Sequence, residues 1–114
     1  MGLDHAALNE LLQVIGGERA MLVELIESFE QEGPRIMRDM IGAAEAGDLV
    51  ALRRAAHTMK SSARDFGATH LSELCAALEH HMASATPVIP TDQVAAIADE
   101  FSAALSELAA FKAD

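Results

Sequence analysis

The residue with the clearest capacity for chemistry is His57, which lies in a short basic stretch of an otherwise acidic chain. The 114-residue sequence carries eight basic and eighteen acidic side chains, a formal charge of −10. Residues 53–64 hold four of the basic side chains and no acidic one, so this stretch is +4 and the rest of the chain is −14. An imidazole, with an ordinary pKa of about 6.5, is a nucleophile at neutral pH. A nucleophile in a cationic patch is suited to hold a transient dianion.

On a helical wheel, this patch gathers around the imidazole. The side chains within roughly 60° of His57 are basic, small or, in one case, valine: Val50, Arg53, Arg54, Lys60, Ser61 and Arg64. The apolar residues of the same segment fall on the opposite side: Leu52, Ala56, Met59 and Ala63. His57 is therefore predicted to face solvent, with Lys60 one turn further on to neutralise a bound anion. A solvated basic face with an incidental histidine would give the same pattern, so the pattern alone leaves both interpretations open.

Helical periodicity explains every strong apolar pattern in the chain. The expected helices cover residues 4–15, 18–46, 48–65, 68–83 and 91–111. Short connections between amphipathic helices favour antiparallel neighbours. We therefore predict an all-α fold, an antiparallel four-helix bundle with a short additional N-terminal helix, in a single domain over residues 1–114.

Two features of the expected helices determine how they are phased. In the helix over 18–46, the apolar phase continues across Gly33-Pro34, so one long helix kinked at Pro34 is predicted. Its inward residues are expected to include Leu25. Gly47-Asp48 is typical of a helix stop followed by an N-cap, and so fixes the start of the segment that carries His57.

The composition excludes several classes of function. The net charge of −10 argues against non-specific binding to nucleic acid and against an anionic membrane surface. No apolar run is long enough to span a bilayer, and the N-terminus lacks the features of a signal peptide. Cys75 is the only cysteine, which favours a reducing cytoplasm. The sequence thus predicts a cytoplasmic globular protein. Its starting Met favours a free-standing protein, and a domain excised from a longer protein stays as the alternative.

The stretch AHTMKSSARDFGATHLSELCAALE resembles the signature of histidine-containing phosphotransfer (HPt) domains. The matching parts are Ala56-His57-Thr58-Met59-Lys60, Phe66-Gly67-Ala68, Leu71, Cys75 and Leu78-Glu79. The upstream short helix, the Gly16-Gly17 break and the Gly47-Asp48 step extend the likeness over nearly the whole chain. The resemblance implies a helical bundle of the HPt type.

The resemblance also implies a function. An HPt domain accepts a phosphoryl group from the aspartate of a response-regulator receiver domain onto histidine Nε2 and passes it to another receiver. His57 would be the phosphorylated residue and Lys60 the residue that stabilises the phosphate. The implied partners are receiver domains and a sensor or hybrid histidine kinase. A divalent metal is expected on the receiver, and the chain itself is expected to need no cofactor, to have no autonomous catalytic activity and to act as a monomer.

Partner docking is predicted to use the residues around His57, namely Val50, Arg53, Arg54, Ser61 and Arg64. Ser61 stands where the family usually has glycine, which concerns the fit of the partner more than the chemistry. Glu79 is a further candidate, because Glu79 and His57 lie at similar distances from the Gly67 turn on antiparallel helices. Its carboxylate could accept the Nδ1–H of His57 and orient the ring, or it could be an ordinary exposed glutamate.

Other functional motifs and candidate residues give weaker support to other functions. The Asp-Ser-Leu attachment motif of acyl-carrier proteins is absent, and so are Glu-x-x-His and His-Glu-x-x-His metal motifs. No metal site is expected, and Cys75 is interpreted as a packing residue. The main alternative function is a non-phosphorylated helical adaptor that keeps the bundle; loss of the histidine or the lysine would indicate it, and both are present.

Overall fold

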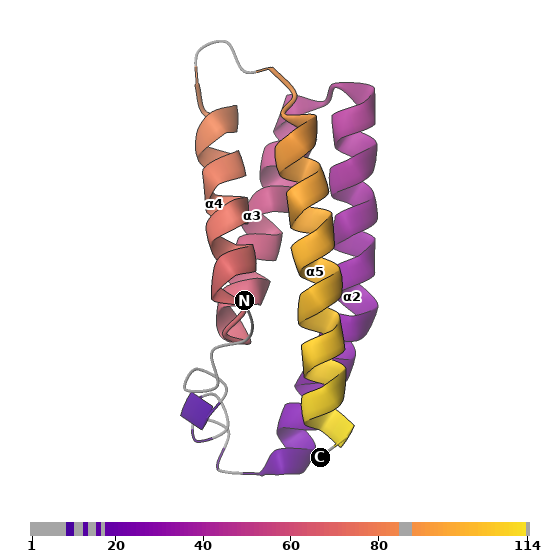
Figure 1. The fold of residues 1–114 in the computed structure, drawn as a ribbon, viewed down its shortest axis with the longest axis vertical. Helices are drawn as coiled ribbons and strands as arrows, with labels where there is room; N and C mark the ends of the chain where they lie inside the picture. Colours follow the sequence, from indigo (N-terminus) through magenta and orange to yellow (C-terminus); the bar gives the residue numbers. More distant parts are fainter. Residues whose placement is uncertain (1–8, 11–12, 14–15, 17, 85–87, 114) are drawn as a thin grey trace.

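The computed structural model describes residues 9–10, 13, 16, 18–84 and 88–113 and consists there of α-helices without any strand (Figure 1). The four helices are α2 (Arg19–Ala46), α3 (Leu49–Asp65), α4 (Thr69–Met82) and α5 (Thr91–Ala113). Helix α3 packs against α2 and α4, and α5 packs against the same two helices. The predicted all-α bundle is confirmed for this part of the chain. The short helix expected over residues 4–15 falls almost entirely outside the described residues.

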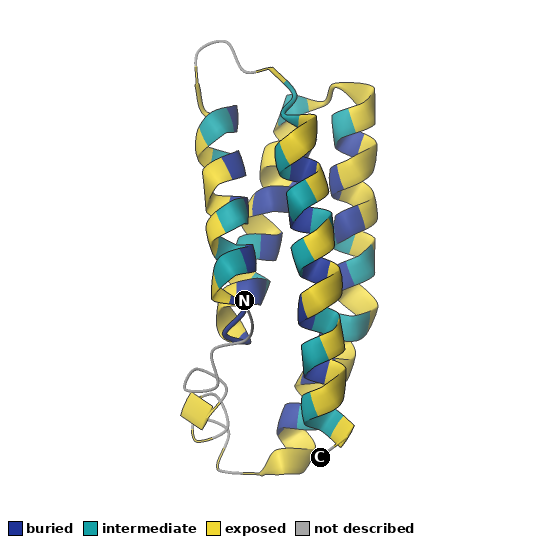
Figure 2. Ribbon diagram, in the orientation of Figure 1, coloured by how far each residue is buried: buried dark blue, intermediate teal, exposed yellow. Residues whose placement is uncertain are grey.

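Each helix places one apolar stripe toward the centre of the bundle (Figure 2). The largest fully buried side chains come from all four helices: Leu22, Ile26, Met40, Leu52, Met59, Leu71, Leu78, Ile97, Leu108 and Cys75. The expectation that Leu25 points inward is wrong, because its side chain is 39% exposed. The inward stripe of α2 is centred on Leu22, Ile26 and Phe29, and Leu25 lies at its edge in a shallow groove beside Asp65 and Phe66.

The two turns around α3 set the orientation of the helix that carries His57. Gly47 ends α2 with φ +71°, a left-handed conformation that costs glycine little. The Asp48 carboxylate then accepts the Ala51 N–H at 3.0 Å, as an N-cap does. At the other end Gly67, also at φ +71°, lies two positions after Asp65, the last residue of α3. The start and end of α3 are therefore fixed within one residue, and with them the side of the helix on which His57 lies.

Gly33 and Pro34 lie inside α2, which runs through both residues as one helix. Gly33 is buried, and a Cβ added to it would lie 2.7 Å from Cε1 and Cζ of Phe101. The Phe101 ring in turn stands edge-on to Phe29, with ring centroids 5.8 Å apart. Gly33 is therefore a packing residue that lets α5 approach α2 closely.

The end of α5 is fastened to the first turns of α2. The Arg19 guanidinium lies over the Phe111 ring, 4.7 Å from its centroid, and donates to the Phe111 carbonyl. Lys112 Nζ is 2.6 Å from Glu30 Oε1 and 3.7 Å from Glu27 Oε2. Hence α2 begins and α5 ends at the same end of the bundle (Figure 1). Among the described helices, none combines the length and the apolar character that a membrane crossing requires.

Candidate functional site

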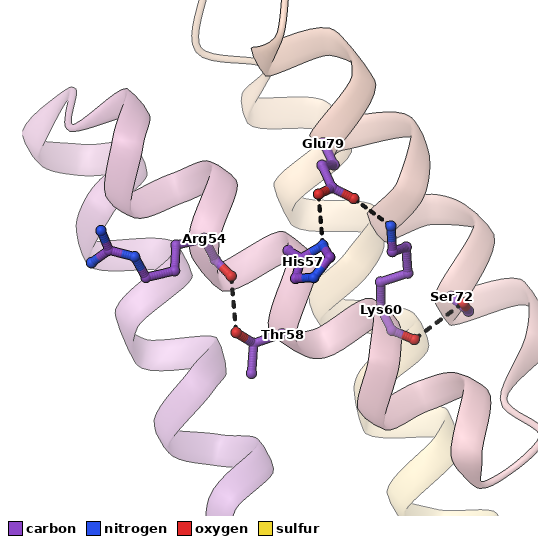
Figure 3. A network of polar contacts seen from close by, with 6 residues as sticks. All are labelled: Arg54, His57, Thr58, Lys60, Ser72 and Glu79. Carbon is purple, nitrogen blue, oxygen red and sulfur yellow. Dashed lines mark hydrogen bonds and ion pairs between the residues drawn. The ribbon is translucent and has the colours of Figure 1, made fainter.

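His57 lies on the outer face of α3, and Figure 3 shows its ring turned toward α4. Its side chain is 60% exposed, as the helical wheel predicts. The ring nitrogen Nδ1 lies 2.7 Å from Glu79 Oε2 on α4. With a neutral ring, an ionised Glu79 can only accept, so Nδ1 carries the hydrogen and Nε2 keeps its lone pair. The contact therefore selects the tautomer in which Nε2 is the nucleophile.

Lys60 binds the other oxygen of the same carboxylate. Its Nζ lies 2.6 Å from Glu79 Oε1, and the side chains of Lys60 and Glu79 are only 20% and 19% exposed. The hydrogen bond from Lys60 lowers the pKa of the Glu79 carboxyl, partial burial opposes this effect, and the hydrogen bond from His57 adds to it. Glu79 is thus held ionised between two cation-forming groups, with one oxygen for each.

Two further hydrogen bonds lie close to these residues, one between α4 and α3 and one within α3 (Figure 3). Ser72 Oγ on α4 donates to the backbone carbonyl of Lys60 at 3.2 Å, which fixes the height of α3 relative to α4. Thr58 Oγ1 donates to the backbone carbonyl of Arg54 at 3.0 Å, one turn back on the same helix. Sequence reasoning missed Ser72, because nothing in the pattern of a single helix shows which serine meets a carbonyl of its neighbour.

The five predicted docking residues lie on the surface, but they do not all surround the imidazole. Val50, Arg53, Arg54, Ser61 and Arg64 are all exposed, Val50 to 68%. In Figure 3, the Arg54 side chain extends away from His57 and toward α2. The basic face is therefore broader than the helical wheel suggests, and part of it belongs to the junction of α2 and α3.

Two other histidines lie close to oxygen atoms elsewhere in the chain. His70 Nε2 lies 3.9 Å from Glu100, and His81 Nε2 lies 2.9 Å from the Val88 carbonyl oxygen. Cys75 is a fully buried free thiol, and burial raises its pKa to about 12, so it carries little thiolate at neutral pH. Over residues 18–84 and 88–113, His, Cys, Asp and Glu side chains form no group of three that could bind a metal ion.

The shifted pKa of Glu79 predicts how acid acts on the bundle. Because the pKa of this carboxyl is lower in the folded protein than in the unfolded chain, its contacts stabilise the fold above the ordinary pKa of 4.5. That contribution is lost as the pH falls through the folded-state pKa. We expect Glu79→Gln to lose less stability than the wild type between about pH 5 and pH 3, measured by urea unfolding at each pH. Parallel curves for the two proteins would show that Glu79 is not held by these contacts.

A comparison with known protein families finds a match for most of the chain. Residues 24–111 match the family described as "Hpt domain". The chain belongs to the Hpt family. Hpt domains are phosphocarriers of histidine phosphorelays.

A curated relative supports the family assignment. Over 83 residues the chain is 35% identical to the "Sensor protein TorS" of Escherichia coli (strain K12). The matched region covers 73% of this chain and only 9% of that sensor, so the likeness concerns one small part of a much longer protein. Among solved structures, none matches the chain significantly.

Proposed function

We propose that this Hpt domain accepts a phosphoryl group from a receiver-domain aspartate onto Nε2 of His57 and passes it to the aspartate of another receiver. The observation that carries the proposal is the contact between Glu79 Oε2 and His57 Nδ1 at 2.7 Å. This contact leaves Nε2 as the free nucleophilic nitrogen on a side chain that is 60% exposed. The non-phosphorylated adaptor has no comparable use for an oriented, accessible imidazole.

The transfer requires one bond to form and one to break. Nε2 forms a bond to phosphorus, the P–O bond to the receiver aspartate breaks, and that carboxylate leaves with the electron pair. Positive charge develops on the imidazole during the attack. The ionised Glu79 stabilises that charge through Nδ1–H, which remains on the ring. The reverse transfer to the second receiver uses the same contacts in the opposite order.

Lys60 is proposed to stabilise the phosphoryl oxygens. In this structure Lys60 Nζ donates a hydrogen bond to Glu79 Oε1 at 2.6 Å, and the other oxygen of that carboxylate contacts His57. A phosphoryl group on Nε2 would bring up to two negative charges next to this pair. We expect Lys60 to share its three donors between Glu79 and the phosphoryl oxygens, since an ammonium can serve both.

The other groups that the reaction needs are assigned to the partners. A sensor or hybrid histidine kinase would supply the phosphoryl group through its receiver, and the receiver would hold the divalent metal. Besides the His57–Glu79 contact, the described part of the chain places one other imidazole beside a carboxylate, His70 at 3.9 Å from Glu100. We assign the chain the role of carrier. A cytoplasmic location and a monomeric state stay predictions from the sequence.

A transfer assay tests the proposal. The purified chain is incubated with a receiver domain labelled by radioactive phosphate, and the labelled product is treated with acid and with alkali. We expect label on the chain that is lost in acid and retained in alkali, as for a phosphohistidine. Label that resists acid, or no transfer from any receiver paired with a hybrid kinase of the source organism, would contradict it and favour the adaptor.

Removal of the Lys60 ammonium should slow the transfer without unfolding the bundle. Lys60→Ala removes a charge-assisted hydrogen bond at the reacting group, so we expect a rate roughly ten-fold to a hundred-fold lower. Single-turnover transfer from a labelled receiver measures it, with circular dichroism as the check on folding. Lys60→Arg keeps the charge and should recover part of the loss. Normal transfer by Lys60→Ala would remove Lys60 from the mechanism.

A further inference from the structure

A groove of about 610 Å³ runs between α2 and α3, directly beside the reacting face. Thr58, the neighbour of His57 in the sequence, forms part of its wall, and so does Arg54. The charged groups that line it are three guanidinium groups and two carboxylates: Arg35, Arg38, Arg54, Asp39 and Asp48. In a chain with a net charge of −10, this lining stands out as cationic.

The contacts of these groups show which of the charges remain available to a partner. The Asp48 carboxylate is committed to the cap of α3, where it accepts the Ala51 N–H. Arg35 is paired with Glu32 on its own helix. Arg38 and Arg54 are exposed, and neither makes an ion pair among the residues that the structure describes. Two guanidinium groups from adjacent helices thus face the groove without an ion-pair partner among the described residues, beside the carboxylates of Asp39 and Asp48.

From this arrangement we infer that the α2–α3 groove is a second docking site for the receiver partner, where Arg38 and Arg54 bind carboxylates beside its reacting aspartate. This inference rests on the proposed function. Guanidinium groups bind carboxylates through paired donors, which fixes orientation as well as contributing affinity. The floor between the arginines consists mainly of small side chains, including Gly42, Ala51 and Ala55, so a partner segment can lie close to the backbone.

The position of the groove gives it a role in selecting partners. His57 and Lys60 act on a phosphoryl group, which is the same in every receiver. Arg38 and Arg54 would instead contact groups that differ from one receiver to another. Complementary charges at such a site raise the rate of encounter and favour one partner over another, while the transfer step itself is unaffected. Arg38 and Arg54 are therefore assigned to specificity.

Neutral substitutions with a matched charge control test this assignment. Arg38→Gln/Arg54→Gln lowers the net charge by two and keeps much of each side chain. Ser102→Glu/Ser106→Glu lowers it by the same amount through two exposed positions on α5. The probe is the receiver domain that labels the wild-type chain fastest. Its Kd in the unphosphorylated form and its KM and kcat in transfer are measured at low and at high salt.

We expect the arginine variant to raise Kd and KM roughly five-fold or more at low salt, with kcat changed by less than about two-fold. High salt should reduce the difference, because exposed charges are screened. The serine variant should change Kd by less than about two-fold. Equal effects of the two variants would assign the loss to net charge and overturn the inference. An unchanged Kd of the arginine variant, or a fall in its kcat alone, would also overturn the inference. If the wild-type chain is labelled normally but the arginine variant gives one of these contrary results, only the docking role of the groove is overturned. The proposed function then stands.

Discussion

Replacing His57 with glutamine should reduce labelling of the chain by a phosphorylated receiver to background, a loss on the order of 100-fold or more. Glutamine is close in size and can still hydrogen-bond to Glu79, but an amide nitrogen has no lone pair available for attack on phosphorus. The bundle should be unaffected because the side chain is 60% exposed. Transfer of label, followed over time with equal amounts of folded protein, measures the effect.

His70 provides the matched control for this experiment. It is also an imidazole beside a carboxylate, with Nε2 3.9 Å from Glu100. There the carboxylate faces Nε2, the nitrogen that would have to react. His70→Gln should therefore accept label at the wild-type rate. If His57→Gln keeps its label while His70→Gln loses it, the phosphorylated residue has been assigned to the wrong helix.

The second large effect is on stability and comes from Gly33. A Cβ at this position would meet the Phe101 ring at 2.7 Å, and that ring is itself packed against Phe29. A leucine must therefore push α5 away from α2 or displace two buried rings. We expect Gly33→Leu to lower the free energy of unfolding by roughly 3 kcal/mol. The melting temperature should fall by about 10 °C or more, measured by circular dichroism.

Gly42 lies on the same helix and tests the explanation. A Cβ added there meets nothing within 4 Å. Because glycine is a poor helix former, Gly42→Leu should stabilise the protein by about 0.5 kcal/mol. Opposite signs for the two substitutions would show that contact with Phe101 decides the outcome. A loss at both positions would mean that side-chain size on α2, and not this contact, is responsible.

The features that follow from the period of a single helix could be predicted from the sequence. The exposure of His57 and the capping role of Asp48 depend only on local spacing and turn chemistry. The approach of Glu79 to His57 required one more step, the similar distance of both residues from the Gly67 turn. That step succeeds because two antiparallel helices joined by a short turn leave little freedom in their relative height.

What could not be predicted depends on how neighbouring helices cross. The sequence pattern shows Gly33 only as a residue inside a helix kinked at Pro34, whereas its role is defined by a phenylalanine 68 positions further along the chain. Leu25 has the spacing of an inward residue, but its side chain is 39% exposed because none of the described helices α3, α4 and α5 covers it. The direction of Arg54 toward α2 and the bond from Ser72 to the Lys60 carbonyl belong to the same class. A one-dimensional pattern contains no information about these crossings.

The contact of Arg19 with Phe111 has a consequence for how such a domain can be combined with others. Because the two ends of the described bundle are fastened together, a chain that enters at α2 also leaves nearby, after α5. A bundle of this kind can be appended to a larger protein, or spliced into one of its surface loops, through a single point of attachment. In either arrangement His57 lies on the outer face of α3, along the side of the bundle and not at the end that carries the attachment. Its exposed side chain therefore stays accessible to partners in solution.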